Sequence, residues 1–226
     1  METLMSILFV LLTFIVIATF NYFYFRTTSE AATVSPELPV RPKVPVMAKE
    51  LGFSIPQGYS FHPGHAWVVR EGRGNARVGL DGFAADLVGK IDQVDIGTMG
   101  RWVRQGQRLL TVHAAGLSFD ILSPVEGVVT AMNEDVVKDP SVVSRDPYKD
   151  GWIAVLESPD FSINQKNLLQ GSMVAPWMHY NVARLNTTIA QSNPQFAQDG
   201  GVPLGQVLPR LDPELRQKLI KDLFLN

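Results

Sequence analysis

The side chains of this sequence that could do chemistry are few, and they are mainly histidines and carboxylates. The chain has four histidines and no cysteine. His62 and His65 stand three residues apart in a proline-containing loop, a spacing that could bring two imidazoles near one metal ion, although no third ligand is evident. The alternative is that both rings pack or form surface hydrogen bonds. The lack of cysteine excludes disulfides, Cys-ligated metals, iron–sulfur clusters and thiol catalysis.

The carboxylates and the remaining motifs give no indication of an active site. Asp92 and Asp95 are three residues apart on an expected strand, Ile91–Ile96, so they are predicted to face opposite sides rather than form an acid–base pair. His113 ends another expected strand and is interpreted as a residue on the rim of the following turn. No nucleophile elbow, phosphate loop or dinucleotide fingerprint occurs. The sequence therefore predicts a protein that is not an enzyme, with no metal site.

These residues belong to a segment, 59–160, whose pattern is that of short strands separated by Gly/Pro turns. Such a pattern predicts a mainly β fold, a small barrel or sandwich. Val112–Gly127 reads as a hairpin with the apolar tip Ala114–Leu117, followed by a proline-marked turn. The expected strands are Ala66–Arg70, Ala76–Leu80, Ile91–Ile96, Arg108–His113, Phe119–Leu122, Val128–Asn133 and Trp152–Glu157, with a turn at Trp102–Gln107 and helical turns at Asp81–Val88 and Glu134–Val137.

About 100 of the 226 residues resemble the H protein of the glycine cleavage system, a lipoyl carrier with a barrel-sandwich hybrid fold. The resemblance starts at His65-Ala66-Trp67-Val68, which is close to the family's HEWV. It is most specific downstream, where the family's motifs recur in order. These are Ser123-Pro124-Val125-Glu126-Gly127, Asn133-Glu134, Pro140, Asp146-Pro147-Tyr148 and Gly151-Trp152-Ile153.

The resemblance implies a specific departure from the family at the hairpin tip. Ser123-Pro124 and Asp120 set the register, and the family's lipoyl-lysine position then falls on Gly116, with His113 at the place of a family glutamate. Glycine has no amine to acylate, so no cofactor is predicted. The other lysines of the segment, Lys90, Lys138 and Lys149, lie outside the hairpin. Ala114, Ala115, Gly116 and Leu117 are interpreted either as a contact with another protein or as a vestigial turn.

The N-terminal part, 1–26, is predicted to be a membrane anchor. Leu4–Phe25 holds 22 residues without a charge, long enough for a helix of roughly 33 Å. Arg26, Arg41 and Lys43 follow it, which by the positive-inside tendency predicts a single-pass protein of the inner membrane with its C-terminal domain in the cytoplasm. A cleaved signal peptide is the alternative. In the predicted linker, 27–58, Pro36, Pro39, Pro42 and Pro45 recur every third residue, the period of polyproline II.

The C-terminal part, 161–226, is predicted to be helical. Asn164–Leu185 carries apolar residues on one side and is expected to kink at Pro176, Ile189–Val202 is expected to be a loop, and a last helix follows Asp212-Pro213-Glu214. These helices either cover the β domain or bind a partner. The candidate protein-binding residues are Trp177, Leu219, Leu223 and Phe224.

Three functions are compatible with these features. The first is a non-lipoylated H-like domain that serves as an accessory subunit of a larger membrane complex, such as a respiratory or photosynthetic one. Its partners would be other membrane subunits and the lipid bilayer. The second is a membrane-tethered carrier of one-carbon or sulfur metabolism with another attachment site, and the third is an adaptor of the membrane-fusion type. The net charge of −2 and the scattered basic residues argue against a nucleic-acid partner, and no small-molecule substrate is evident.

Overall fold

The computed structural model describes residues 5, 12–20, 22, 47–50, 52–192 and 206–224 of a chain that forms two units, Met1–Lys43 and Val44–Asn226. In the first unit, residues 12–20 are helical. Within the described ranges, no helix combines the length and the apolar character needed to cross a membrane. Half of the predicted span Leu4–Phe25 lies outside those ranges, and the proline-rich segment 35–46 lies wholly outside them.

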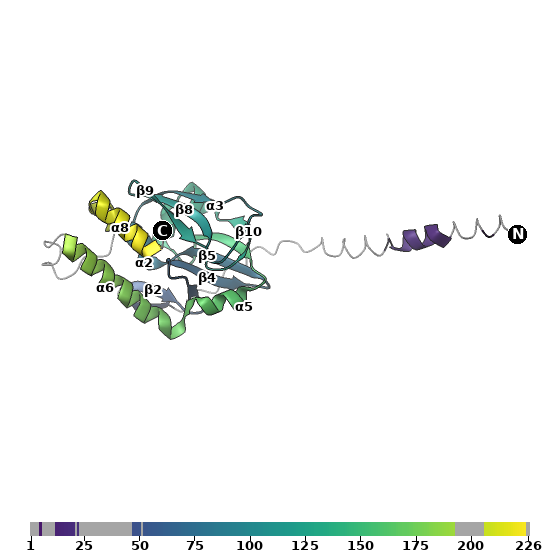
Figure 1. The fold of residues 1–226 in the computed structure, drawn as a ribbon, viewed down its shortest axis with the longest axis horizontal. Coiled ribbons are helices and arrows are strands. Elements are labelled where there is room, and N and C mark those ends of the chain that lie inside the picture. The colour runs from purple at the N-terminus through teal and green to yellow at the C-terminus, as the bar shows by residue number, and fades with distance from the viewer. Residues whose placement is uncertain are drawn as a thin grey trace. The chain divides into compact units, whose positions relative to one another are not determined.

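The second unit is built on antiparallel sheets (Figure 1). One sheet has seven strands in the order β12-β3-β4-β5-β11-β10-β7, and another has three in the order β6-β8-β9. The strands of the larger sheet are β3 (Ser60–Phe61), β4 (Ala66–Glu71), β5 (Asn75–Leu80), β7 (Trp102–Val103), β10 (Gly127–Met132), β11 (Trp152–Glu157) and β12 (Leu169–Gln170). Those of the smaller sheet are β6 (Ile91–Ile96), β8 (Arg108–Ala114) and β9 (Leu117–Leu122).

The strands predicted from alternating and apolar runs are present, most within one residue of their expected ends. β4, β5, β6 and β11 confirm four of them, and β9 starts two residues earlier than predicted. The turn expected at Trp102–Gln107 begins with a short strand, β7, because Val103 pairs with Gly127. The helix α2 (Gly82–Val88) starts at an Asp81 side chain that accepts a hydrogen bond from the Ala84 N–H, and α3 (Glu134–Lys138) starts at Asn133.

A two-stranded sheet lies inside the segment that the sequence analysis interpreted as linker. β1 (Met47–Glu50) pairs with β2 (Phe53–Pro56). Phe53 and Ile55 are buried, and the Phe53 ring meets the Phe83 ring of α2 edge-on at a centroid distance of 5.7 Å. Apolar burial against α2 therefore makes this part of 27–58 a structured piece of the β domain rather than a spacer.

The C-terminal segment contains short elements and two longer helices. The short elements are α5 (Phe161–Asn164) and the 3-10 turns η1 (Gln165–Asn167), η2 (Gly171–Met173) and η3 (Leu208–Arg210), and the longer helices are α6 (Val174–Ser192) and α8 (Pro213–Phe224). A further short helix, α4 (Ser141–Arg145), precedes β11. The kink expected at Pro176 is absent. Pro176 stands in the first turn of α6, where its missing N–H has no helical partner to lose. Ile189–Ser192, expected as loop, continues α6, and 193–205 lie outside the described residues.

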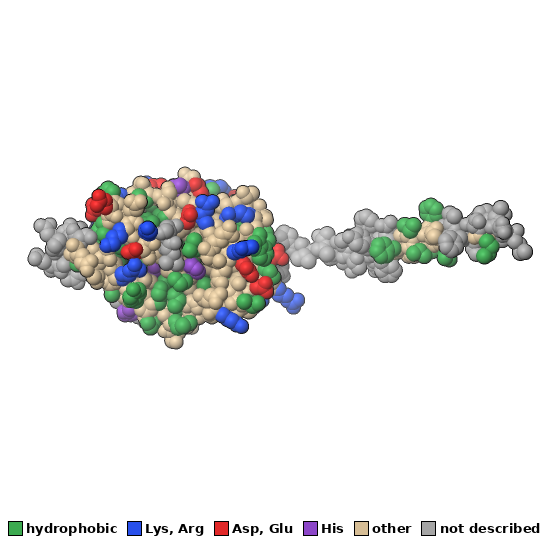
Figure 2. Space-filling model, in the orientation of Figure 1, with side chains coloured by type: hydrophobic (Ala, Val, Ile, Leu, Met, Phe, Trp, Pro, Cys, Tyr) green, Lys and Arg blue, Asp and Glu red, His purple; other side chains and the backbone are tan. Residues whose placement is uncertain are grey.

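The two longer helices α6 and α8 lie on the same side of the β domain (Figure 1). Arg184 of α6 and Asp222 of α8 form an ion pair at 3.2 Å between Nη2 and Oδ2. The face drawn in Figure 2 carries Lys and Arg side chains interspersed with Asp and Glu, so no single sign of charge dominates it.

Candidate functional site

The hairpin formed by β8 and β9 ends in a two-residue turn. Ala114 pairs with Leu117, and Ala115 and Gly116 between them have φ angles of 52° and 76°. Two successive positive φ values are the geometry of a type I′ hairpin turn, whose twist matches that of the strands. Glycine adopts this conformation without strain, whereas alanine adopts it at a cost of about 1–2 kcal/mol.

The side chains of the tip differ in their surroundings. Ala114 is buried, Ala115 and Leu117 are partly buried against the core, and Gly116 is exposed with open space where a Cβ would stand. The turn carries no lysine. Lys90 stands at the same end of the three-stranded sheet as the turn, because the next residue, Ile91, pairs with Ala114, and the Lys90 side chain is 82% exposed.

The terminal helix α8 contacts the hairpin in two ways, through a hydrogen bond to the backbone of the turn and through an aromatic contact with β9. The Arg216 guanidinium donates from Nη1 to the carbonyl oxygen of Ala115 at 2.6 Å and from Nε to that of Leu211 at 2.9 Å. At the last residue of α8, the Phe224 ring packs on the Phe119 ring of β9 at a centroid distance of 4.5 Å. The hairpin tip is therefore bound by a segment of its own chain.

The predicted protein-binding residues of the two helices face this chain's own core. Leu219, Leu223 and Phe224 are buried within the domain, and Trp177 is half-buried. Trp177 stacks on His65 at 4.9 Å. These positions fit helices that cover the β domain, and Trp177 keeps part of its side chain exposed.

His65 is the point at which the core meets both helices. Its ring lies between those of Phe83 and Trp177, and Phe224 meets it edge-on at 5.9 Å. Its Nδ1 donates to Asp81 at 2.8 Å, inside the domain. His62 instead accepts a hydrogen bond from the Gly64 N–H at its Nδ1 (3.0 Å). Within the described residues, no group of three His, Cys, Asp or Glu side chains is placed to hold a metal ion.

A chain of polar side chains crosses the exposed face of the three-stranded sheet. Ser118 Oγ lies 2.7 Å from His113 Nδ1, and His113 Nε2 lies 2.8 Å from Asp95 Oδ2. Gln93 donates to the other oxygen of Asp95. The hydrogen bonds from His113 and then from Gln93 hold the pKa of the Asp95 carboxyl below its ordinary value. The Asp95 carboxylate thus stays ionised and accepts a hydrogen bond from His113 Nε2.

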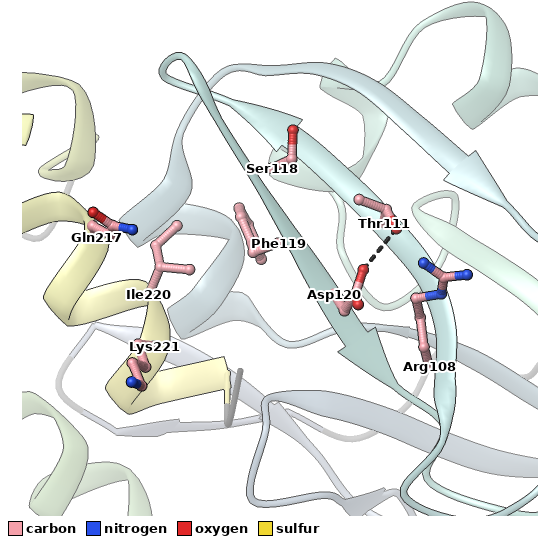
Figure 3. Close-up of a pocket in the computed structure, with 8 residues that line it drawn as sticks. All are labelled: Arg108, Thr111, Ser118, Phe119, Asp120, Gln217, Ile220 and Lys221. Atoms are coloured by element: carbon pink, nitrogen blue, oxygen red, sulfur yellow. Dashed lines mark hydrogen bonds between the residues drawn. The ribbon is translucent and has the colours of Figure 1, made fainter.

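Beside these hydrogen-bonded side chains lies a pocket of about 450 Å³, between the three-stranded sheet and α8 (Figure 3). Its strand side presents polar and cationic groups, and the Thr111 hydroxyl donates to Asp120 Oδ1 at 2.7 Å. The lining residues are Arg108, Thr111, Ser118, Phe119 and Asp120 from the strands and Gln217, Ile220 and Lys221 from α8.

His113 was predicted at the rim of the turn, whereas its partners Asp95 and Ser118, and Arg216, were not predicted as site residues. His113 and Ser118 are directly opposed across β8 and β9, which the hairpin register alone could have indicated. The Asp95 contact depends in addition on the pairing of β6 with β8. Arg216 gives no sequence signal, since it is one cation on the polar side of a helix.

The antiparallel sheets and the hairpin with its two-residue turn define the class of this domain, which is mainly β with C-terminal helices. The model of the family described as "Glycine cleavage H-protein" matches residues 59–179, more than half of the chain. The chain belongs to this family, which confirms the resemblance seen in the sequence. The match continues past the β strands into the start of α6.

Individual proteins similar to this chain are also H proteins. The glycine cleavage system H protein of Coprothermobacter proteolyticus is 33% identical over 109 residues, which cover 48% of this chain and 86% of that protein. The H protein of Legionella pneumophila (strain Corby) is 37% identical over 105 residues, 46% of this chain and 82% of that protein. A crystal structure of an H protein from Mycobacterium marinum matches with a TM-score of 0.43 and 26% identity, covering 46% of this chain and 86% of that chain.

Proposed function

We propose that this chain is an H-like protein without lipoate, which serves as an accessory, structural subunit of a larger membrane complex. Proteins of the family are carriers rather than enzymes, and they present a lipoyl group from the hairpin. Here the position that corresponds to their lysine is Gly116, whose register follows from Ser123-Pro124. Without an amine on the turn, the hairpin cannot be acylated at that position.

The observation that carries this proposal is the hydrogen bond from Arg216 to the Ala115 carbonyl. A carrier hairpin has to offer its tip to several partner enzymes in turn. In this chain α8 occupies one side of the hairpin, and Phe224, buried against Phe119, fixes the helix in place. The helix α8 therefore makes the hairpin part of a packed surface. Such a surface suits a permanent subunit better than a shuttle.

The membrane location rests on the N-terminal sequence. The uncharged run Leu4–Phe25 and the basic residues after it favour a single pass through the inner membrane with the H-like domain on the cytoplasmic side. The domain would then be held near the membrane, where the other subunits of the complex and the lipid bilayer are its partners.

Native sizing after mild detergent extraction tests this function. The full chain is extracted from membranes of its source cells, separated on a native gel, and the co-migrating proteins are identified by mass spectrometry. The proposal expects a species much larger than the chain alone, with the same membrane proteins in each preparation. A lone monomer in detergent, or recovery of the chain in the fraction that needs no detergent, contradicts it. Protease digestion of sealed inside-out vesicles, which exposes the cytoplasmic side, is the control for orientation.

One observation favours a second candidate, a carrier with a different attachment site. Lys90 is 82% exposed and precedes the residue that pairs with Ala114, so it stands at the same end of the sheet as the hairpin tip. An acyl group on Lys90 would project near the place from which the family presents its own. The variant Lys90→Arg separates the two functions, since it would abolish acylation of a carrier and leave a structural subunit unaffected. Lys138→Arg is the matched control.

A further inference from the structure

We propose that Ser118 is a nucleophilic side chain that accepts an acyl group from an acyl phosphate bound in the pocket of Figure 3. This site goes beyond the structural role proposed above and does not depend on it. It is carried by the order of hydrogen bonds across the sheet and by the position of Ser118 on the wall of a charged pocket.

The charge of Asp95 sets the direction of both hydrogen bonds. An ionised Asp95 can only accept, so His113 donates to it from Nε2. In the neutral ring Nδ1 is then without a proton and must accept, so the Ser118 hydroxyl donates to it across 2.7 Å. Serine, histidine and aspartate are thereby arranged as nucleophile, base and orienting carboxylate. Gln93 fixes Asp95 from the other side.

The side chains of the site are accessible from solvent. The His113 side chain is 34% exposed and the Asp95 side chain 53% exposed, so a reagent from solvent can reach the site. Ser118 lines the pocket together with Arg108 and Lys221, and the carboxylate of Asp120 is the single acidic group in the lining. Two cations and one anion give the lining a net charge of +1, which favours an anionic ligand.

The reaction balances without a further reagent. Ser118 Oγ attacks the acyl carbon while its proton passes to His113 Nδ1. The bond between that carbon and the phosphate oxygen breaks, and the electron pair leaves with the phosphate, which then takes the proton from His113. The products are an acyl ester of Ser118 and inorganic phosphate. Arg108 and Lys221 make the lining net positive, which favours the entry of the acyl phosphate and the retention of the phosphate product. In this scheme Ser118 and His113 act directly, whereas Asp95 is a positioning residue.

The test is acetylation of the purified full chain by acetyl phosphate, with occupancy at each serine followed by peptide mass spectrometry. Ser141 is the internal reference, because its hydroxyl donates to the carboxylate of Asp139 rather than to a histidine. The proposal expects Ser118 to be acetylated well ahead of Ser141. His113→Gln is expected to slow the reaction at Ser118 on the order of a hundredfold, a typical loss for a general base, and to leave Ser141 unchanged.

Two further variants separate the roles of the other residues. Asp95→Asn keeps the shape of the side chain but offers an N–H to Nε2, so the proton of His113 should move to Nδ1 and acetylation should fall. The nitrogen chemical shifts of His113 report this tautomer change independently of the reaction rate. Lys221→Met should raise the acetyl phosphate concentration needed for half-maximal rate. Equal acetylation of Ser118 and Ser141 in the wild-type chain, or an undiminished rate in His113→Gln, overturns the proposal.

Discussion

The guanidinium of Arg216 donates a 2.6 Å hydrogen bond to the carbonyl oxygen of Ala115, joining two residues that are 101 positions apart in the chain. The bond links the terminal helix to the turn of the β8–β9 hairpin. An arginine has five donors in a fixed fork, and here Nε is used as well, on Leu211 of the chain entering α8. Arg216 thus fixes the start of the helix and the hairpin turn at the same time.

Replacing this arginine should loosen the hairpin from the helix. Arg216→Met keeps the length of the side chain and removes both hydrogen bonds, leaving the Ala115 carbonyl without this donor. We expect the free energy of unfolding to fall by about 2 kcal/mol, the range for hydrogen bonds with a charged donor. Urea denaturation measures it. Lys218→Met on the exposed side of the same helix is the control and should change stability by less than about 0.5 kcal/mol. Equal effects of the two variants would mean that the Arg216 bonds contribute nothing.

The aromatic contact at the end of α8 should contribute more than the hydrogen bonds. Phe224 is fully buried and lies against Phe119 and His65. Phe224→Ala is expected to cost about 3–5 kcal/mol because it removes a large buried side chain and leaves a cavity. The same variant should loosen α8 from the β domain. Faster hydrogen exchange of the α8 backbone amides would measure this loosening. Tyr180→Ala, an exposed aromatic on α6, is the comparison and should leave those amides protected. Unchanged exchange in Phe224→Ala would show that α8 is held elsewhere.

A lysine at the hairpin turn should be tolerated by the fold. Gly116 has open space around its missing Cβ, so Gly116→Lys meets no clash, but its φ of 76° carries a cost of about 1–2 kcal/mol. Gly72→Lys has the same open surroundings and a positive φ in the β4–β5 turn, so it should cost as much. Thermal or urea unfolding compares them. A much larger loss at Gly116 would reveal a contact of the tip that the domain itself does not account for.

Stability should decrease on the acid side because of His62. Burial, and secondly the charge of His65, lower the pKa of His62 below its ordinary value of 6.5. The unfolded chain takes up a proton near pH 6.5 and the folded chain does not, so stability is full above that value and is lost as the pH falls through the folded pKa. In His62→Asn the amide oxygen can still accept from Gly64, and the acid loss should shrink. His179→Asn, at an exposed position, should keep the wild-type profile. A profile that is the same in all three proteins would exclude His62 as the cause.

Local patterns predicted most of the β domain. Asp81, at the start of α2, and the alternation in Ile91–Ile96 act through neighbours in the sequence, and Ser123-Pro124 marks the turn after the hairpin. Their structural effects are therefore readable from the residues themselves. The same holds for the apolar side of α8, although the sequence could not decide what that side would cover.

Long-range features could not be predicted in the same way. The predicted kink at Pro176 is absent because the effect of a proline depends on where the helix begins, and Pro176 lies in the first turn of α6. The strands β1 and β2 lie in the predicted linker because Phe53 packs on Phe83, which belongs to a helix distant in the sequence. Asp95, His113 and Ser118 come from three strands whose register only the folded sheet fixes. The need for glycine at position 79 is also a long-range effect, since a Cβ there would lie 2.5 Å from the buried Trp67 ring.

The central claim, that this H-like chain no longer carries lipoate, is tested most directly by peptide mass mapping of the chain isolated from its source cells. The account predicts that every lysine peptide, including that of Lys90, has the mass of the unmodified sequence. An H protein from the same cells serves as the positive control for lipoylation. A lipoyl group on any lysine of this chain would contradict the account.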